Sequence, residues 1–179
     1  MKTILAIFAL VCFTTIGFSQ STKDVKYGIR AGYNISNLDF DPEAPIENRH
    51  RNGFAFGFFA EVPLSEVTSI NTELQWSAEG GKSRDIRANY FNLPIQLRFA
   101  LSENLSIGAG PQVSLKTWED NDSFSTFAFS GVAGVEYVFT NDLFIDLRYS
   151  YGLTNILDDE ASPLEATNFN FQIGIGIKI

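Results

Sequence analysis

The sequence contains very few of the cysteine and histidine residues on which many enzymes and metalloproteins depend. It has one cysteine (Cys12), one histidine (His50) and one methionine in 179 residues. A single thiol cannot form a disulfide within the chain, and the cysteine and histidine spacings that hold zinc are missing. The sequence also has no run of 18 consecutive apolar residues, so it offers no transmembrane helix.

Basic residues are scarce as well. Thirteen Lys and Arg stand against 21 Asp and Glu, which gives a formal net charge of −8 at pH 7. A surface of this sign repels phosphate groups. We therefore do not expect nucleic acid as a partner.

The N-terminus is typical of a secretory signal peptide. A positive start is followed by an apolar core over residues 4–13, and Gly17 and Ser19 put small residues at −3 and −1 of a cleavage site. We expect residues 1–19 to be removed, and the lone cysteine with them. Residues 20–179 then form one domain.

The strongest pattern in the chain is an alternation of apolar and polar residues. In residues 89–101 one face carries Phe91, Leu93, Ile95, Leu97, Phe99 and Leu101, and the other carries Tyr90, Asn92, Pro94, Gln96, Arg98 and Ala100. A period of two indicates an extended strand. A strand that crosses a bilayer at a tilt needs about 9–11 residues, apolar toward lipid and polar toward the lumen. This stretch is long enough to be such a strand.

The same alternation recurs along the chain, in residues 25–36, 53–64, 70–77, 89–101, 105–117, 124–139, 143–153 and 167–179. Short polar links at 64–67, 102–104 and 140–142 alternate with longer ones at 38–52, 79–88, 118–123 and 155–166. The sequence therefore predicts an all-β fold, an eight-stranded antiparallel up-and-down transmembrane β-barrel. Short turns and both termini are expected in the periplasm, and the long loops outside the cell. A soluble lipocalin-type barrel is the alternative, but the polar face carries charge and glycine too densely for a solvated exterior.

Several short motifs resemble the PorT-like outer-membrane β-barrel family. They are Tyr90–Ile95, Gly108–Pro111, Gly131–Tyr137, Arg148–Tyr149, Gly152–Ile156 and Gly174–Lys178. The resemblance implies a small barrel in contact with outer-membrane lipids and assembled by the β-barrel insertion machinery. It leaves open whether there is a protein partner. Such barrels often end in an aromatic residue, whereas this chain ends in Ile179.

Charged residues on the inward face form the main candidate site. They are Arg30, Glu61, Glu73, Arg98, Glu136, Asp146 and Arg148. Charges enclosed in a narrow barrel need partners, and we expect pairs between neighbouring strands: Arg30 with Glu61, Glu73 with Arg98, and Glu136 with Arg148. These pairs would form a structural plug, with a gated ion or proton path as the alternative. Nearer the long loops, smaller inward residues predict a hydrated vestibule open to the outside: Gly32, Asn34, Gly57, Gln75, Asn92, Gln112, Ser130 and Asn170.

Aromatic residues near the strand ends predict girdles at the two membrane interfaces. The candidates are Trp76, Trp118, Tyr137, Tyr149 and Tyr151. A carbohydrate or ligand platform is the alternative.

The long loops contain residues for two further candidate sites. Acidic clusters in residues 39–47, 119–122 and 158–160 could hold calcium, although none has the spacing of an EF-hand. His50 could serve a lipid-modifying enzyme together with Ser83, Ser123 or Ser125, although no nucleophile motif surrounds them. The sequence thus favours a non-enzymatic barrel without a cofactor, serving envelope structure, surface interaction or a larger membrane assembly. A rim enzyme and a gated small-solute pore are the alternatives.

Overall fold

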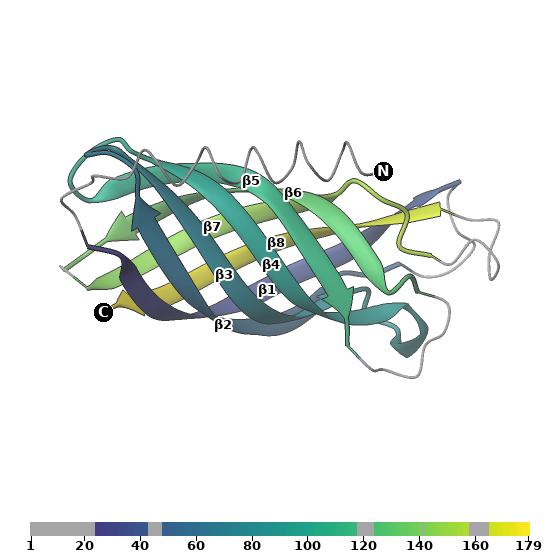
Figure 1. The fold of residues 1–179 in the computed structure, drawn as a ribbon. Coiled ribbons are helices and arrows are strands. Elements are labelled where there is room, and N and C mark those ends of the chain that lie inside the picture. The colour runs from purple at the N-terminus through teal and green to yellow at the C-terminus, as the bar shows by residue number, and fades with distance from the viewer. Residues whose placement is uncertain (1–23, 43–47, 118–123, 141, 158–164) are drawn as a thin grey trace, which may run out of the picture.

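A computed structural model of the protein describes residues 24–42, 48–117, 124–140, 142–157 and 165–179. These residues form one sheet that closes into a barrel, in which each strand pairs with the next and the last pairs with the first (Figure 1). All pairs are antiparallel. The strands are β1 (Lys26–Asp41), β2 (Arg51–Pro63), β3 (Thr68–Gly80), β4 (Arg87–Ala100), β5 (Leu105–Lys116), β6 (Phe127–Val138), β7 (Leu143–Gly152) and β8 (Glu165–Lys178). The eight-stranded up-and-down barrel predicted from the alternation is confirmed.

One short helical turn, η2 (Arg84–Ile86), precedes β4. Within the described ranges, no helix has the length and apolar character needed to cross a membrane. The predicted signal peptide and Trp118 lie outside the described residues.

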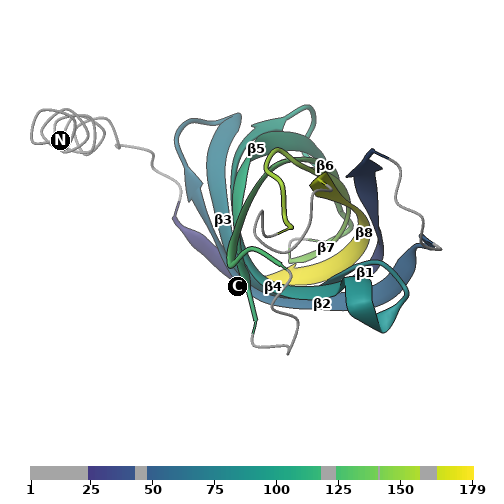
Figure 2. The ribbon, with the colours of Figure 1, turned by 90° about the vertical axis from the view of Figure 1, so that its right-hand side faces the viewer.

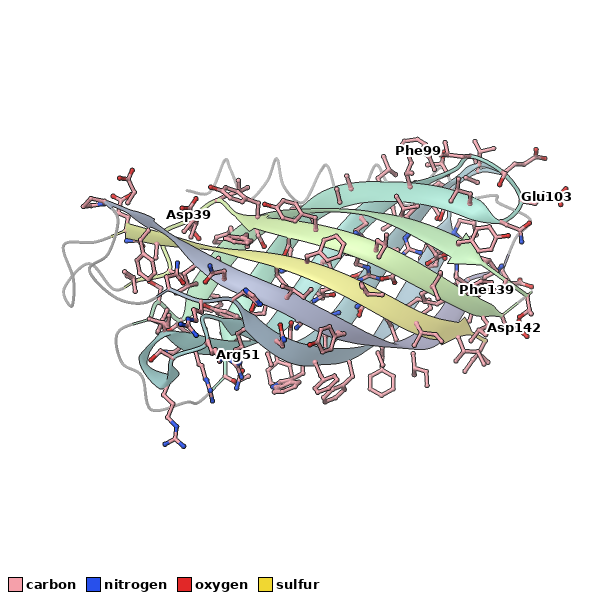
Figure 3. The ribbon with its side chains drawn as sticks, turned by 180° about the vertical axis from the view of Figure 1, so that it is seen from behind. Asp39, Arg51, Phe99, Glu103, Phe139 and Asp142 are labelled. Carbon is pink, nitrogen blue, oxygen red and sulfur yellow. The ribbon has the colours of Figure 1, made fainter. Side chains whose placement is uncertain are left out.

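The two faces of the wall have opposite polarity. On β4, Leu93, Ile95 and Leu97 are 41–44% exposed, whereas Asn92 and Gln96 are 0% and 1% exposed. Figure 3 shows the outward side chains along the whole barrel, with Phe99 and Phe139 near one end. The polar groups are thus enclosed and the large apolar groups face outward, the reverse of a water-soluble domain.

The two ends of the barrel differ. At one end, which we call the short-turn rim, the links are tight and each contains a hydroxyl that accepts backbone hydrogen bonds. Ser65 accepts from Thr68 at 3.0 Å, Ser102 from Leu105 at 3.1 Å and Thr140 from Leu143 at 3.2 Å. Such local side-chain bonds favour turns over continued strand. The opposite end is the long-loop rim, where Asp39 and Arg51 lie (Figure 3).

Two strands extend at least three residues farther toward the long-loop rim than the alternation predicts. β1 continues to Asp41 because residues beyond Ser36 pair with β8, as in Leu38 with Asn168. β3 continues to Gly80, paired with Arg87 of β4. The predicted start of the sixth strand at residue 124 is wrong, because Phe124 forms an isolated bridge with Leu157 instead.

Glycines allow aromatic rings to fill part of the lumen. The rings of Phe59 and Phe144 meet edge to face, with centroids 5.6 Å apart. A Cβ atom on Gly28 would overlap the Phe59 ring, and one on Gly176 would overlap the Phe144 ring. The narrow barrel therefore places each of these two rings against a residue that has no side chain.

Candidate functional site: the barrel lumen

The inward charges lie inside the barrel and form ion pairs with one another. The best-defined pair joins β1 to β7: Arg30 Nε donates to Asp146 Oδ2 at 2.6 Å, and Arg30 Nη2 donates to Asp146 Oδ1 at 2.5 Å. Arg30 Nη1 also donates to Gln172 at 3.0 Å. Arg30 and Asp146 are only 2% and 3% exposed. This two-point geometry is the most favourable one for a guanidinium and a carboxylate.

Two more arginines continue the network. Arg148 Nη1 donates to Glu73 Oε2 at 2.6 Å, which links β7 to β3, and Arg148 Nη2 lies 3.4 Å from Asp146 Oδ2. Arg98 Nη1 donates to Glu136 Oε2 at 2.6 Å and lies 3.6 Å from Glu61 Oε2. Apart from the Arg148–Asp146 contact within β7, these ion pairs connect strands that are not neighbours in the sheet.

The expected pairs between neighbouring strands, Arg30 with Glu61, Glu73 with Arg98 and Glu136 with Arg148, are wrong. The long side chains reach over the adjacent strand because that strand presents a glycine beneath them. A Cβ on Gly174 of β8 would lie 2.5 Å from Arg30 Nη2 and 2.6 Å from Asp146 Oδ1, and one on Gly108 of β5 would lie 2.8 Å from Arg98 Cγ.

Lys178 is a member of the network that the sequence analysis missed. Its Nζ donates to Glu136 Oε1 at 2.5 Å and to Glu61 Oε2 at 2.8 Å, and it lies 5.4 Å from the centroid of the Phe144 ring. The alternation of β8 does place Lys178 on the inward face. With Lys178 included, the ion pairs join four cationic side chains to four anionic ones.

The short-turn rim is open. A cavity of about 520 Å³ enters the barrel there, and Glu61, Arg98, Glu136 and Lys178 are among the residues that line it. Two deeper cavities, one on each side of the middle of the barrel, have volumes of about 10 Å³ each. A volume of that size holds about one water molecule.

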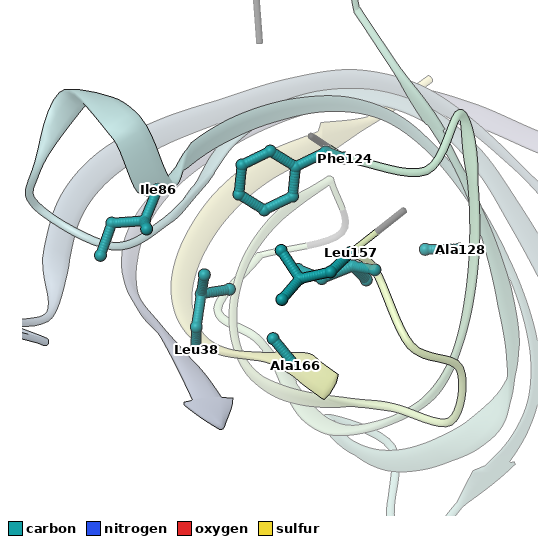
Figure 4. Packing of buried hydrophobic residues seen from close by; sticks show 7 residues of the cluster. Leu38, Ile86, Phe124, Ala128, Leu157 and Ala166 are labelled. Atoms are coloured by element: carbon teal, nitrogen blue, oxygen red, sulfur yellow. The ribbon is translucent and has the colours of Figure 1, made fainter. Parts of the chain in front are cut away.

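The long-loop rim is closed by an apolar cluster, so the predicted hydrated vestibule at this end is wrong. Figure 2 looks into this end of the barrel, and Figure 4 shows the packing. We call the cluster the apolar cap; it consists of Leu38, Ile86, Phe124, Ala128, Ile156, Leu157 and Ala166, each 1–8% exposed. The alternation could not reveal it because Phe124, Ile156 and Leu157 come from segments between strands.

Backbone hydrogen bonds fix the cap. Ser125 N donates to the Ile156 carbonyl at 2.8 Å, and Ile156 N donates to the Ala166 carbonyl at 2.8 Å. The Asn155 Oδ1 atom accepts from Leu157 N at 3.1 Å and from Ala166 N at 2.9 Å. The buried segment therefore satisfies its polar groups while its side chains exclude water.

Glu79 is a second charged lumen residue that the sequence does not predict, because the sequence pattern places residues 79–88 in a loop. It lies on the inward face of β3 and is 2% exposed. Asn92 Nδ2 donates to its Oε1 at 2.7 Å, and Asn168 Nδ2 donates to its Oε2. The described residues provide it with no ion-pair partner.

The described girdle candidates lie on the outer wall. Tyr137, Tyr149 and Tyr151 are 44%, 47% and 41% exposed. The Trp76 ring contacts Phe56 with centroids 5.4 Å apart, and the Tyr137 ring contacts Phe139 at 5.3 Å.

The candidates for catalysis and calcium binding are only partly described. His50 is exposed and forms an isolated bridge with Gly81, Ser83 is also exposed, and Ser125 Oγ donates to the Leu157 carbonyl at 3.3 Å within the cap. Ser123 and most of the acidic loop residues lie outside the described residues. Within the described part of the chain, no three His, Cys, Asp or Glu side chains are grouped as metal ligands.

Comparison with known proteins places the fold among outer-membrane barrels. Ail, the attachment invasion locus protein of Yersinia pestis, superposes with a TM-score of 0.57 at 14% identity, over 88% of this chain and 100% of that one. Neisserial surface protein A superposes with a TM-score of 0.54 at 13% identity, over 87% and 97%. At such low identities the likeness shows the fold alone. No protein of curated function matches the sequence significantly.

The sequence profile of the family described as "Outer membrane protein beta-barrel domain" matches residues 6–177. The match covers nearly the whole chain and agrees with the apolar outer wall and the enclosed polar lumen. The chain therefore belongs to the outer membrane protein β-barrel domain family and is an integral β-barrel of the outer membrane.

Proposed function

We propose that this protein is a non-enzymatic, non-conducting outer-membrane barrel. It would serve envelope structure, surface interaction or a larger membrane assembly through its long loops. The observation that carries the proposal is the closed lumen, in which paired charges fill the middle and the apolar cap fills one mouth. The network of Arg30, Glu61, Glu73, Arg98, Glu136, Asp146 and Arg148, with Lys178, then has a structural role.

We also propose how the protein reaches the outer membrane. Residues 1–19 act as a signal peptide, and the β-barrel insertion machinery assembles residues 20–179 with both termini in the periplasm. Trp76, Trp118, Tyr137, Tyr149 and Tyr151 form the interfacial girdles. Within the family, the motifs quoted above favour the PorT-like group.

Conductance across a planar lipid bilayer tests whether the lumen is closed. The wild-type protein, with insertion verified by protease protection, should give no stable ion-conducting steps. The reason is that a cavity of about 10 Å³ between the charged layer and the cap cannot hold a continuous column of water. Reproducible steps from the wild-type protein would overturn the proposal in favour of a gated pore.

Lipid analysis tests the absence of catalysis. Cells that lack the protein should have unchanged outer-membrane lipids by mass spectrometry. A change in the lipids that wild-type protein reverses, but His50→Ala protein does not, would show a rim enzyme instead.

A further inference from the structure

Glu79 is a carboxylate enclosed directly beneath the apolar cap. It lines one of the two small cavities together with Tyr90, Asn168 and Ile156, and Ile156 belongs to the cap. Enclosing an ionised carboxylate without a positive partner is costly. The amides of Asn92 and Asn168 donate hydrogen bonds to the carboxylate, and the nearby Ser77 and Asn170 side chains are neutral as well.

The neighbouring cation does not neutralise this carboxylate directly. Arg51 Nη1 donates to the main-chain carbonyl of Glu79 at 2.7 Å rather than to its side chain. The four cations of the charged network already contact Glu61, Glu73, Glu136 and Asp146. No cation of the described residues therefore contacts the Glu79 carboxyl group.

Several buried oxygen atoms near Glu79 have no hydrogen-bond partner among the described residues. The Asn92 and Asn168 side chains each donate to Glu79 through nitrogen, while their Oδ1 atoms have no partner. Tyr90 lines the cavity, and its hydroxyl is also unpartnered within the described part of the chain. Asn92 and Tyr90 are 0% and 1% exposed, so bulk water does not reach these atoms.

The cavity is large enough for only one water molecule or one small ion. Its volume of about 10 Å³ is lined by polar groups from several strands, among them Gln112, Ser114, Ser130 and Ser150. That volume suits one water molecule or one cation without its hydration shell. One carboxylate and several neutral oxygens form a donor set for a hard cation.

We propose that Glu79 is the anionic ligand of a buried site for one desolvated alkali cation of the size of Na⁺. Asn168 and Tyr90, which line the same cavity, supply neutral oxygen atoms to the ion. A single negative charge matches a monovalent ion, whereas Ca²⁺ would leave an excess positive charge in the lumen. Mg²⁺ retains several waters, for which this cavity has no space.

An ion bound at this site stabilises both the apolar cap and the lumen beneath it. The ion lies between strands β3, β4 and β8, which contribute Glu79, Tyr90 and Asn168 respectively. A ligand that binds only the folded state raises its stability with concentration. Sodium should therefore stabilise the barrel beyond its effect on ionic strength.

The test compares thermal unfolding of the full mature chain in detergent micelles, in sodium chloride and in choline chloride at equal ionic strength. We expect sodium to raise Tm by on the order of 5 °C at saturation, and choline to have no such effect. Equilibrium dialysis with radioactive sodium should find one ion retained per folded chain.

Two variants complete the test. Glu79→Gln should abolish both the retained ion and the sodium dependence of Tm, whereas Glu103→Gln, in an exposed turn, should keep both. Equal Tm values in sodium and choline with no retained ion would overturn the proposal, because the carboxyl would then carry a proton. Retention of sodium by folded Glu79→Gln would overturn it as well. Dialysis of the wild-type protein does not depend on whether the variant folds.

Discussion

Asp146 is the residue on which the charged layer of the lumen depends most. It accepts two hydrogen bonds from Arg30, at 2.5 and 2.6 Å, and lies 3.4 Å from Arg148. All three side chains are almost completely buried. Removing one partner of a buried pair leaves the other charge uncompensated.

Asp146→Asn should therefore lower the free energy of unfolding by about 3–5 kcal/mol. The measurement is a urea titration of the protein folded in phospholipid vesicles. Asp142→Asn makes the same chemical change at an exposed position of the short-turn rim and should cost less than about 0.5 kcal/mol. Equal effects of the two substitutions would mean that the network does not stabilise the fold.

Gly176 gives a second prediction for a single residue. In Gly176→Ala the added methyl would collide with the Phe144 ring and lie 2.7 Å from the Ile29 carbonyl oxygen. Overpacking of this kind costs about 1–3 kcal/mol, measured by the same titration.

Gly131→Ala is the matched control, because nothing lies within 4 Å of a Cβ built at that position. We expect Gly131→Ala to change the free energy of unfolding only slightly. A loss at Gly131 as large as that at Gly176 would show that backbone preference, rather than packing in the lumen, decides the outcome.

Single residues also show how far the sequence could predict the lumen. Alternation alone places Arg30 and Asp146 on the inward face. It cannot predict their pairing, because that depends on how far side chains reach over Gly174 once the barrel has closed. The predicted strand ends at Ser77, three residues before β3 ends at Gly80. It therefore leaves Glu79 in a loop, although the alternation with Gln75 and Ser77 continues.

At the scale of elements, β4 shows the difference between the two faces most clearly. Ile95 is 44% exposed on the outer wall and lies near the middle of the strand, and Gln96 beside it is 1% exposed. A period of two was enough to predict this element from sequence. The alternation did not predict how far β1 and β3 extend. Their additional residues are strand because they pair with the neighbouring strands β8 and β4.

Ile95→Arg should cost about 2–4 kcal/mol, because it places a charge in the centre of the hydrocarbon. Leu101→Arg, just beyond the end of the same strand, should cost about 0–1 kcal/mol because the side chain reaches the interface. Folding titrations in lipid vesicles measure both values. The reverse order would contradict the placement of β4 in the bilayer.

The apolar cap is an element without a strand pattern. Its residues come from β1, η2, β6, β8 and the segments at Phe124 and Ile156–Leu157. Short apolar pieces in predicted loops are consistent with many arrangements. Their burial inside the barrel follows from the hydrophobic gain of filling a mouth that β-strands leave open.

At the scale of the whole molecule, the barrel is closed differently at its two ends. Apolar side chains close the long-loop rim, whereas the short-turn rim opens into a cavity of about 520 Å³ that ends on paired charges. Lipid covers the apolar outer wall, so the fold is stable only when hydrocarbon or detergent surrounds it. This dependence on lipid can be predicted from the sequence, because the outward face of each strand is apolar and the inward face is polar.

Tryptophan fluorescence quenching in bilayers tests the central claim, that lipid covers the outer wall, most directly. In chains without Trp76 and Trp118, a single tryptophan replaces Phe91, Leu93, Ile95 or Leu97. We expect strong quenching by lipids brominated in their acyl chains, greatest at Leu93 and Ile95, and almost none by aqueous iodide. Efficient quenching by iodide at these central positions would contradict it.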